Sequence, residues 1–284
     1  MKKLLVTGGS GYLGKRVVEL AHNWDVTYTW FRKPPKDALR GDPKQVDLCD
    51  LDQVQQMVMA CDPDIIIHTA CSDRSEDAIV PAASNISTLA SQQSVRLVHV
   101  STDMVLDGKH PPYRDEAKPC PLSSYGAAKA NAELMVRDAV QSALVVRTSL
   151  IFGTDPLDRQ TTWLVDGLEK GIELRLFQDE YRCPIWVDNL ATALLELASR
   201  DLSGFLNVAG SQVVNRWQLG MKLLSFLGLQ SEKNVRPAKL SESGMLRPAD
   251  LTLDTRRARA YLRTPLLTVD EALEQMSRQV VSNS

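Results

Sequence analysis

The stretch Thr7-Gly8-Gly9-Ser10-Gly11-Tyr12-Leu13-Gly14 follows a short apolar run at residues 3–7 and precedes an amphipathic segment. A glycine-rich turn between a strand and a helix is typical of a dinucleotide-binding site, because glycine allows a tight turn and lets the backbone approach the pyrophosphate. The helix that follows would present its amide groups to the phosphates. The glycines fit either of two spacings, which begin at Gly8 or at Gly9. We expect Gly8, Gly11, Tyr12, Leu13 and Gly14 to contact a cofactor.

Short apolar runs alternate with longer amphipathic segments through the first 150 residues, the pattern of a parallel sheet covered by helices on both faces. We predict strands at 3–7, 26–30, 65–68, 97–101 and 144–147, and helices at 14–21, 51–60, 78–93 and 125–140. Residues 187–199 and 205–208 resemble a late helix and strand of the same sheet. The predicted fold is α/β, a Rossmann-type doubly wound parallel sheet with a smaller, discontinuous C-terminal substrate-binding lobe. Residues 1–150 and about 184–209 would form the cofactor domain, and about 151–183 and 210–284 the lobe.

Composition excludes several classes of protein. The 284 residues carry 33 basic and 35 acidic side chains, a formal charge of −2, without the cationic footprint of a nucleic-acid or membrane-surface binder. Apolar runs stay well short of the ~18 residues that span a membrane. Five cysteines without C-x-x-C spacing suggest reduced thiols and a cytoplasmic protein. Four histidines without ligand spacing suggest that no metal is bound. Whether the protein is a monomer or a homodimer stays open.

Two cations, Arg32 and Lys33, follow the second predicted strand, where NAD-binding proteins usually carry a carboxylate for the ribose 2′-hydroxyl. Guanidinium and ammonium groups suit the 2′-phosphate of NADPH. We therefore expect NADPH as the cofactor, with NADH as the alternative.

Tyr125 and Lys129 are four residues apart and would share one face of a helix. The preceding Pro121-Leu122-Ser123-Ser124 resembles a helix start, which places Tyr125 in the first turn. There the helix dipole and Lys129 would both favour the phenolate. Upstream, Ser101 and Thr102 end a predicted strand, and a hydroxyl at that edge could bind a substrate carbonyl beside Tyr125.

Together these residues resemble an extended short-chain dehydrogenase/reductase, and within that superfamily the dTDP-4-dehydrorhamnose reductase family. The resemblance covers most of the chain. Further family-like segments are Asp47-Leu48, 63–70, Asn85, 101–108, 147–153, 183–191, Arg247-Pro248 and Leu253-Asp254.

The resemblance implies a catalytic triad of Thr102, Tyr125 and Lys129 that reduces the C4 ketone of a nucleotide-linked deoxysugar. Tyr125 would donate the proton, Lys129 would lower its pKa and hold the nicotinamide ribose, and Thr102 would bind the carbonyl. The remaining implied contacts are with the cofactor (Asp47, Leu48, Thr69, Ala70) and with the substrate (Thr102, Asp103, Met104, Leu150, Arg182, Arg247). Arg147, Arg182 and Arg247 are candidates for the pyrophosphate of the substrate, and each could equally form a structural ion pair.

Some departures from the family pattern keep alternatives open. Leu150 stands where the family commonly has a tryptophan near the sugar, so a reductase of another substrate is possible. Related dehydratases have an Asp-Glu pair, whereas Asp103 is followed by Met104, and an NAD-dependent epimerase is disfavoured by Arg32 and Lys33. Lys15-Arg16 replaces the acidic residue of metal-bridged dimers. The same family also resembles the regulatory beta subunit of methionine adenosyltransferase, a non-catalytic NADP-binding protein.

Overall fold

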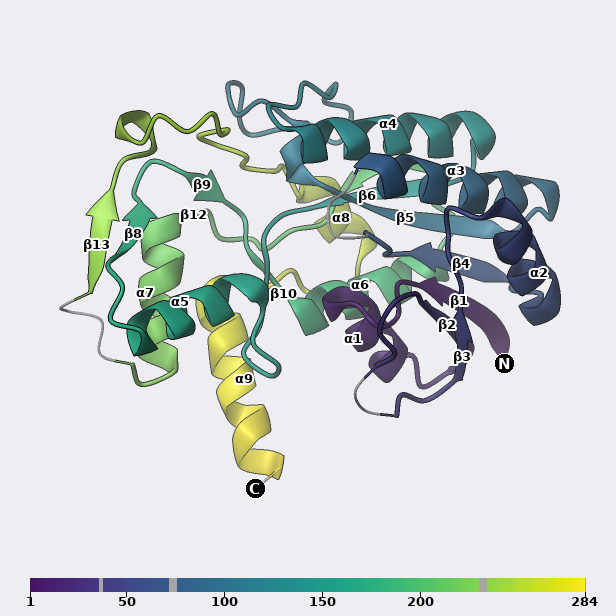
Figure 1. Ribbon diagram of the computed structural model, residues 1–284, viewed down its shortest axis with the longest axis horizontal. Helices are drawn as coiled ribbons and strands as arrows, with labels where there is room; N and C mark the ends of the chain where they lie inside the picture. The colour runs from purple at the N-terminus through teal and green to yellow at the C-terminus, as the bar shows by residue number, and fades with distance from the viewer. Residues whose placement is uncertain (36–37, 72–75, 230–233, 284) are drawn as a thin grey trace.

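The computed structural model describes residues 1–35, 38–71, 76–229 and 234–283. A seven-stranded sheet in the order β11-β6-β5-β4-β1-β2-β3, parallel throughout, lies at the centre of the larger lobe (Figure 1). Its strands are β1 (Lys2–Thr7), β2 (Trp24–Trp30), β3 (Asp42–Gln45), β4 (Ile65–His68), β5 (Arg96–Thr102), β6 (Leu144–Thr148) and β11 (Gly204–Asn207). The strand order reverses at β1, so the crevice beyond the carboxyl ends of β1 and β4 is where ligands of this fold bind.

Helices cover both faces of the sheet, as predicted. One layer contains α2 (Leu51–Cys61), α3 (Glu76–Gln92) and α4 (Ser124–Ala139), and the other contains α1 (Tyr12–Leu20) and α6 (Val187–Ala198) (Figure 1). Side chains of the sheet alternate between the layers: Leu5 and Ile66 pack towards α2, α3 and α4, while Leu4 and Val6 pack towards α1 and α6. Asp50 caps α2, because its side chain accepts a hydrogen bond from the backbone amide of Gln53.

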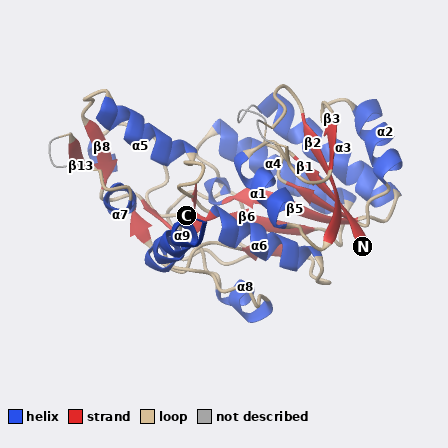
Figure 2. Cartoon of the chain, turned by 90° about the horizontal axis from the view of Figure 1, so that it is seen from below, coloured by secondary structure: helices blue, strands red, loops and turns tan. Residues whose placement is uncertain are grey.

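A smaller lobe is formed by segments that follow β6. Besides α6 and β11, the chain after β6 forms β7 (Ile151–Phe152), α5 (Arg159–Glu169), β8 (Leu174–Phe177), β9 (Tyr181–Arg182), β10 (Ile185–Trp186), β12 (Val214–Asn215), α7 (Arg216–Phe226), β13 (Val235–Ala238), α8 (Arg256–Tyr261) and α9 (Val269–Asn283). Of these, α8 packs against β11 of the central sheet. Figure 2 shows α5, α7, β8 and β13 at one end of the molecule and the sheet at the other. Between these segments the chain returns to the larger lobe through α6 and β11, as residues 187–199 and 205–208 predicted.

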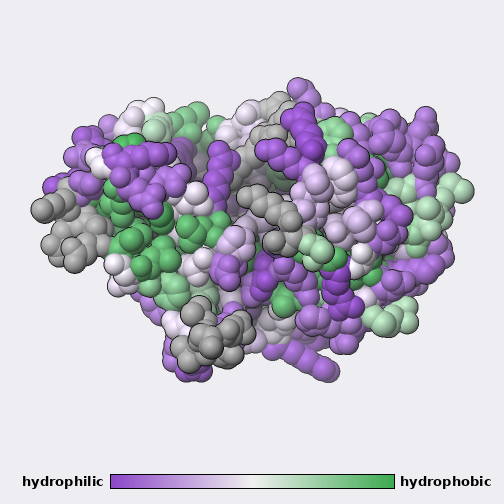
Figure 3. Space-filling view, turned by 60° about the horizontal axis from the view of Figure 1, so that its bottom comes forward, coloured by the Kyte–Doolittle hydropathy of each residue, from purple (hydrophilic) through white to green (hydrophobic). Residues whose placement is uncertain are grey.

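One hydrophobic cluster runs through both lobes. It includes Leu4 and Val17 of the larger lobe and Leu219, Leu223 and Met276 of the smaller one. On the face that Figure 3 shows, hydrophobic side chains gather over the smaller lobe, and hydrophilic ones dominate the larger lobe. Within the described ranges, no helix has the length and apolar character needed to cross a membrane. The five cysteines, all of which the structure describes, are free thiols.

The structure contains one strand of the central sheet that the sequence did not predict. Residues Asp42–Gln45 form β3 at the edge of the sheet, parallel to β2. An edge strand can accept Pro43, whose missing amide would weaken a central strand. The strand has no apolar alternation because its side chains are largely exposed, so periodicity could not reveal it.

Candidate active site

The glycine-rich turn connects β1 to α1 and is as tight as its sequence predicts. Gly8 has φ +74°, and a Cβ there would lie 2.7 Å from the Cα of Ala70. The amide of Gly11 donates a 2.9 Å hydrogen bond to the carbonyl of Gly8, and Gly14 packs against that same carbonyl and Thr69. Both the conformation and the space therefore require glycine. Tyr12 and Leu13 open α1 immediately beyond the turn.

The end of β2 is connected to this turn, because the amide of Gly8 donates a hydrogen bond to the hydroxyl of Thr29. Arg32 and Lys33 follow β2 and are exposed, and the Arg32 guanidinium lies 5.6 Å from the centre of the Phe31 ring. The two predicted cations therefore lie at the carboxyl edge of the sheet, on the strand next to the turn.

Four further predicted cofactor residues follow the next strands along this edge. Asp47 and Leu48 come after β3, and the Leu48 carbonyl accepts a hydrogen bond from the Asn85 amide on α3. Thr69 and Ala70 follow β4, and the Thr69 hydroxyl donates to the carbonyl of Thr7. The turns after β1 and β4 are thus directly bonded to each other.

Thr102 and Tyr125 are placed by close contact between two elements. Thr102 ends β5 and caps a short 3-10 helix, Asp103–Val105, while Tyr125 lies in the first turn of α4, as predicted. Gly126 makes the contact possible, since a Cβ at this position would collide with the carbonyl of Met104. Ser123 caps α4 by accepting from the Gly126 amide. Sequence reasoning missed Gly126, although its place directly after the tyrosine was a usable signal.

Lys129 lies one turn further along α4, and its ammonium group is buried. It donates a 2.7 Å hydrogen bond to the carbonyl of Val100 on β5. Burial lowers the pKa of Lys129, while Cys71 and Glu133 act in the opposite direction. Cys71, exposed at the end of the turn after β4, has its sulfur 4.0 Å from the Tyr125 hydroxyl. The sequence analysis did not include this thiol among the site residues.

Arg147 forms a structural ion pair, which settles one of the alternatives left open above. It binds the buried carboxylate of Glu133, and its remaining donor reaches the carbonyls of Asp115 and Ala117. Its guanidinium carbon also lies 4.6 Å from the centre of the Phe205 ring. Because this arginine is 1% exposed and fully partnered, it is not placed to bind substrate phosphate.

Asp103 is buried directly beneath Thr102. Its carboxylate accepts a 2.7 Å hydrogen bond from Ser149 and a 3.3 Å hydrogen bond from Thr102, and the Arg182 Nε lies 3.7 Å away. Burial raises the pKa of Asp103, and Arg182, Ser149 and Thr102 partly offset that effect. In this structure Asp103 faces protein groups, so its position suits orientation of Thr102 better than the direct substrate contact expected above.

Of the other predicted substrate residues, two are arginines bound to polar or charged groups, and one is a leucine in an apolar environment. Arg182 is buried and donates to the carbonyls of Tyr181 and Pro248, with Met104 sulfur 3.7 Å from its Nη2. Arg247 is partly exposed and pairs with Glu180. Leu150 is half-buried against the main hydrophobic cluster. Sequence reasoning missed Arg216, whose Nε lies 3.8 Å from the Glu180 carboxylate.

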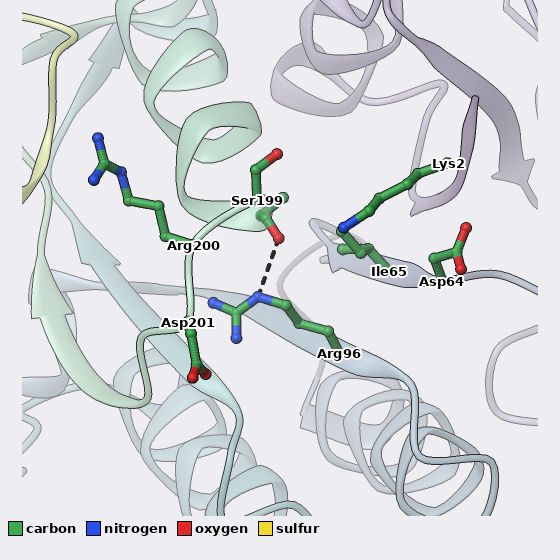
Figure 4. A pocket seen from close by; sticks show the side chains of 8 residues that line it. Lys2, Asp64, Ile65, Arg96, Ser199, Arg200 and Asp201 are labelled. Carbon is green, nitrogen blue, oxygen red and sulfur yellow. Dashed lines mark hydrogen bonds between the residues drawn. The ribbon is translucent and has the colours of Figure 1, made fainter.

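A cavity of about 290 Å³ lies at the opposite, amino edge of the sheet. Lys2 and Asp64 line one side of it, and Arg200 and Asp201 line the other (Figure 4). Arg96 lies between them and donates hydrogen bonds to the carbonyls of Leu197, Ala198 and Leu202. It therefore caps the carboxyl end of α6. Because ligands of this fold bind at the carboxyl edge, this cavity is not the candidate site. Among the described residues, no group of three acidic, histidine or cysteine side chains could hold a metal.

Known proteins resemble most of the chain. The chain is 28% identical over 238 residues to the probable low-salt glycan biosynthesis reductase of Haloferax volcanii, covering 78% of this chain and 79% of that protein. It is 28% identical over 278 residues to methionine adenosyltransferase 2 subunit beta of Pongo abelii, covering 89% and 80%. The crystal structure of dTDP-4-dehydrorhamnose reductase from Bacillus anthracis, in complex with NADP, superposes with a TM-score of 0.83 at 23% identity, covering 98% and 100%. A family model described as the RmlD substrate binding domain matches residues 1–282, and the chain therefore belongs to that family.

Proposed function

We propose that this protein is an NADPH-dependent oxidoreductase that reduces the C4 ketone of a nucleotide-linked deoxysugar. The observation that carries the proposal is the contact of the first turn of α4 with the turn after β5, which brings Tyr125 towards Thr102 across Gly126. The Haloferax volcanii relative is named as a reductase, and the Bacillus anthracis reductase, which has the same fold, was solved with NADP.

The residues present fit the cofactor. The tight turn at Gly8 leads directly into α1, whose amino-terminal amide groups would bind the pyrophosphate. Arg32 and Lys33 are exposed on the neighbouring strand and would hold a 2′-phosphate, with NADH as the weaker alternative. Asp47-Leu48 and Thr69-Ala70 would line the adenine and the ribose. When bound, NADPH supplies the hydride.

Proton transfer would fall to the chain's own residues. Tyr125 would donate the proton of its hydroxyl to the ketone oxygen as that oxygen gains negative charge. The buried ammonium of Lys129 would favour the phenolate left behind and hold the nicotinamide ribose. Thr102 would donate a hydrogen bond to the same oxygen. We propose that residues 1–150 and about 184–209 form the cofactor domain of a cytoplasmic enzyme, and that about 151–183 and 210–284 bind the sugar nucleotide.

The test is NADPH oxidation with dTDP-4-dehydro-6-deoxy-L-mannose and with other keto-sugar nucleotides. The Tyr125→Phe variant should lose turnover by about 100- to 10,000-fold, the usual contribution of a general acid, and still bind NADPH. Tyr261→Phe is the matched control, because Tyr261 is exposed on α8 beside Arg257. Unchanged turnover in Tyr125→Phe would refute its role as the proton donor.

A regulatory subunit is the second candidate, supported by the similarity to methionine adenosyltransferase 2 subunit beta. The presence of Thr102, Tyr125 and Lys129 favours the enzyme. Size-exclusion chromatography with light scattering, together with affinity purification, separates the two candidates. A stoichiometric partner combined with no turnover on any keto-sugar nucleotide would favour the regulatory subunit.

A further inference from the structure

Three buried polar side chains lie side by side on neighbouring strands of the central sheet. Thr7 ends β1, His68 ends β4 in register with Thr7, and His99 lies on β5 in register with His68. We call these three residues the polar row. The residues two positions earlier on the same strands are apolar and pack in the cluster between the sheet and α2, α3 and α4: Leu5, Ile66 and Leu97. Because side chains alternate along a strand, the polar row lies on that same face, which α3 and α4 cover (Figure 1).

The two histidine rings are held in place by each other and by Thr7. Their centroids are 5.1 Å apart, with 27° between the ring planes, so the rings are stacked. A 2.6 Å hydrogen bond joins the Thr7 hydroxyl to His68 Nδ1. His68 is 2% exposed and His99 is 1% exposed. The plane of the His99 ring is therefore set by His68, which Thr7 holds in turn.

Hydrogen bonding in the polar row is incomplete. Among the residues that the structure describes, His99 Nδ1 and Nε2 are buried and have no hydrogen-bond partner. Leaving a buried polar atom without a partner costs free energy, and native structures seldom do so without a functional reason. An unpartnered ring at this depth implies that a nearby polar group reaches it.

Lys129 is the charged group next to the polar row. It extends from α4 to the carbonyl of Val100, the residue after His99. Burial lowers the pKa of both His68 and His99, and the positive charge of Lys129 lowers it further. Both rings are therefore neutral near pH 7, and a neutral imidazole has one nitrogen that accepts a hydrogen bond. The ammonium group has three N–H groups, one of which the Val100 carbonyl accepts.

The other titratable groups around Lys129 come from α4, from β6 and from the turn after β4. Tyr125 and Glu133 lie one turn before and one turn after Lys129 on α4. Cys71 and Glu133 both raise the pKa of Lys129, against the effect of burial. Glu133 is already bound by Arg147 on β6. The polar row therefore supplies the acceptor best placed to stabilise the ammonium.

We propose that His99 is a positioning residue for Lys129. Its acceptor nitrogen receives a second N–H of the ammonium group, and His68 and Thr7 hold the ring at the required angle. This inference rests on the proposed function, because Lys129 is the lysine of the proposed catalytic triad. The bond keeps the ammonium charged inside the protein and limits its rotation. It gives a role to two histidines that no motif indicated.

The experiment measures the pKa of Lys129 directly, by NMR of the full chain carrying lysine labelled at Cε. Each lysine Cε signal follows its own titration, and Lys129→Arg identifies the signal of Lys129. His99→Phe keeps a flat ring against His68 but has no ring nitrogen. The pKa of Lys129 should then fall by about one pH unit, the effect of one hydrogen bond to a charged group. His99→Gln keeps an acceptor oxygen and should restore most of the loss.

Steady-state kinetics on the same variants tests whether the bond matters in turnover. We expect kcat for NADPH oxidation to fall by about tenfold in His99→Phe and to recover in His99→Gln. KM for the keto-sugar nucleotide should change by less than about threefold, because His99 is 1% exposed and cannot contact the substrate. His22→Phe is the matched control, because His22 is exposed on the turn after α1. It should leave both kcat and the pKa of Lys129 unchanged.

The proposal is overturned if Lys129 titrates at the same pH in His99→Phe as in the wild type. It is also overturned if His99→Gln lowers the pKa of Lys129 as much as His99→Phe, since packing and not an acceptor would then matter. His99→Leu is the second variant without a ring nitrogen, for use if His99→Phe does not fold. The titration is independent of turnover. If the pKa of Lys129 depends on His99 but no keto-sugar nucleotide is reduced, the reductase function fails and the role of His99 stands.

Discussion

Arg147 binds Glu133 through two hydrogen bonds, from Nε at 2.9 Å and from Nη2 at 2.7 Å, with both side chains buried. The pair connects β6 to α4 one turn beyond Lys129. Ser101 donates a third hydrogen bond to Glu133 at 2.6 Å. The carboxylate beside the proposed catalytic lysine is therefore fixed by three donors, and Arg147 supports the site without contacting it.

Removing Arg147 should destabilise the fold. Arg147→Met leaves Glu133 as a buried charge without its main partner, so we expect the free energy of unfolding to fall by about 3–5 kcal/mol. Urea denaturation followed by circular dichroism measures the change. Arg175→Met, at an exposed arginine, is the control and should cost less than about 1 kcal/mol. An equally small loss in Arg147→Met would contradict the structural role.

Cofactor preference should depend on Arg32 and Lys33. Replacing both with alanine removes the cations expected to bind the 2′-phosphate, and NADPH affinity should fall by about 10- to 100-fold. Affinity for NADH, which lacks that phosphate, should change by less than about threefold. Fluorescence titration with both cofactors gives the comparison. Lys44→Ala on β3 is the control, and parallel losses for both cofactors would refute the assignment.

Alkylation of Cys71 should block the candidate site. Its thiol is exposed and 4.0 Å from the Tyr125 hydroxyl, so an added carboxamidomethyl group would occupy the space beside that hydroxyl. We expect iodoacetamide to abolish NADPH oxidation and bound NADPH to slow the inactivation. Iodoacetamide should not reduce the rate of NADPH oxidation by Cys71→Ala below the rate of the untreated variant. It should still inactivate Cys120→Ala, which removes another exposed thiol. Undiminished inactivation of Cys71→Ala would place the reactive thiol elsewhere.

Asp103 should influence kcat more than KM. Asp103→Asn changes the acceptor that orients the Thr102 hydroxyl, and we expect kcat to fall by about tenfold, the scale of one hydrogen bond. KM should change by less than about threefold, since the Asp103 side chain faces Thr102, Ser149 and Arg182. Steady-state kinetics on the best substrate measures both constants. A rise in KM with unchanged kcat would instead assign Asp103 to substrate binding.

The stability of the fold should depend on pH through Glu196 on α6. Burial opposes its ionisation, but hydrogen bonds from the Arg263 amide, Arg200 and Thr264 lower the pKa of Glu196 from 4.5 to about 2. A lowered carboxyl pKa gives stability that is complete above the unfolded value and is lost as the pH falls towards the folded value. The full pKa shift corresponds to about 3 kcal/mol, and solvent screening at this partly exposed carboxylate leaves about 1–2 kcal/mol of stability.

Glu196→Gln should therefore be less stable than the wild type by a constant amount between pH 6 and pH 8. The difference should narrow as the pH falls below about 4.5, where the unfolded carboxyl becomes protonated. Chemical denaturation across this range measures it. Glu274→Gln, at an exposed carboxylate on α9, is the control and should match the wild type. If Glu196→Gln and the wild type have the same free energy of unfolding at pH 7, the Glu196 carboxylate does not stabilise the fold.

The sequence predicted the features that depend on residues close together in the chain. The glycine turn is tight because Gly8 and Gly14 have no room for a Cβ, and the apolar run Ile65-Ile66-Ile67 gave β4 its bounds. β3 escaped prediction because Asp42-Pro43-Lys44-Gln45 has no apolar pattern, and only pairing with β2 makes it a strand.

The charges around the site were harder to predict, because their partners are distant in sequence. Arg147 is structural owing to Glu133 on another element, and Arg182 is buried because Glu180, Asp103 and the Pro248 carbonyl surround it. A sequence motif gives the identity of an arginine but not the carboxylate that it meets. Arg216 carried no motif, and only the fold brings it to Glu180.

The hydrophobic cluster that includes both Leu4 and Met276 has a consequence for how the protein melts. Because the lobes share this cluster, neither can lose its packing without exposing apolar surface of the other. They should therefore unfold together, in one cooperative transition, and neither should be recovered as a folded fragment after proteolysis. Activity lost on heating would then follow the population of the whole folded chain.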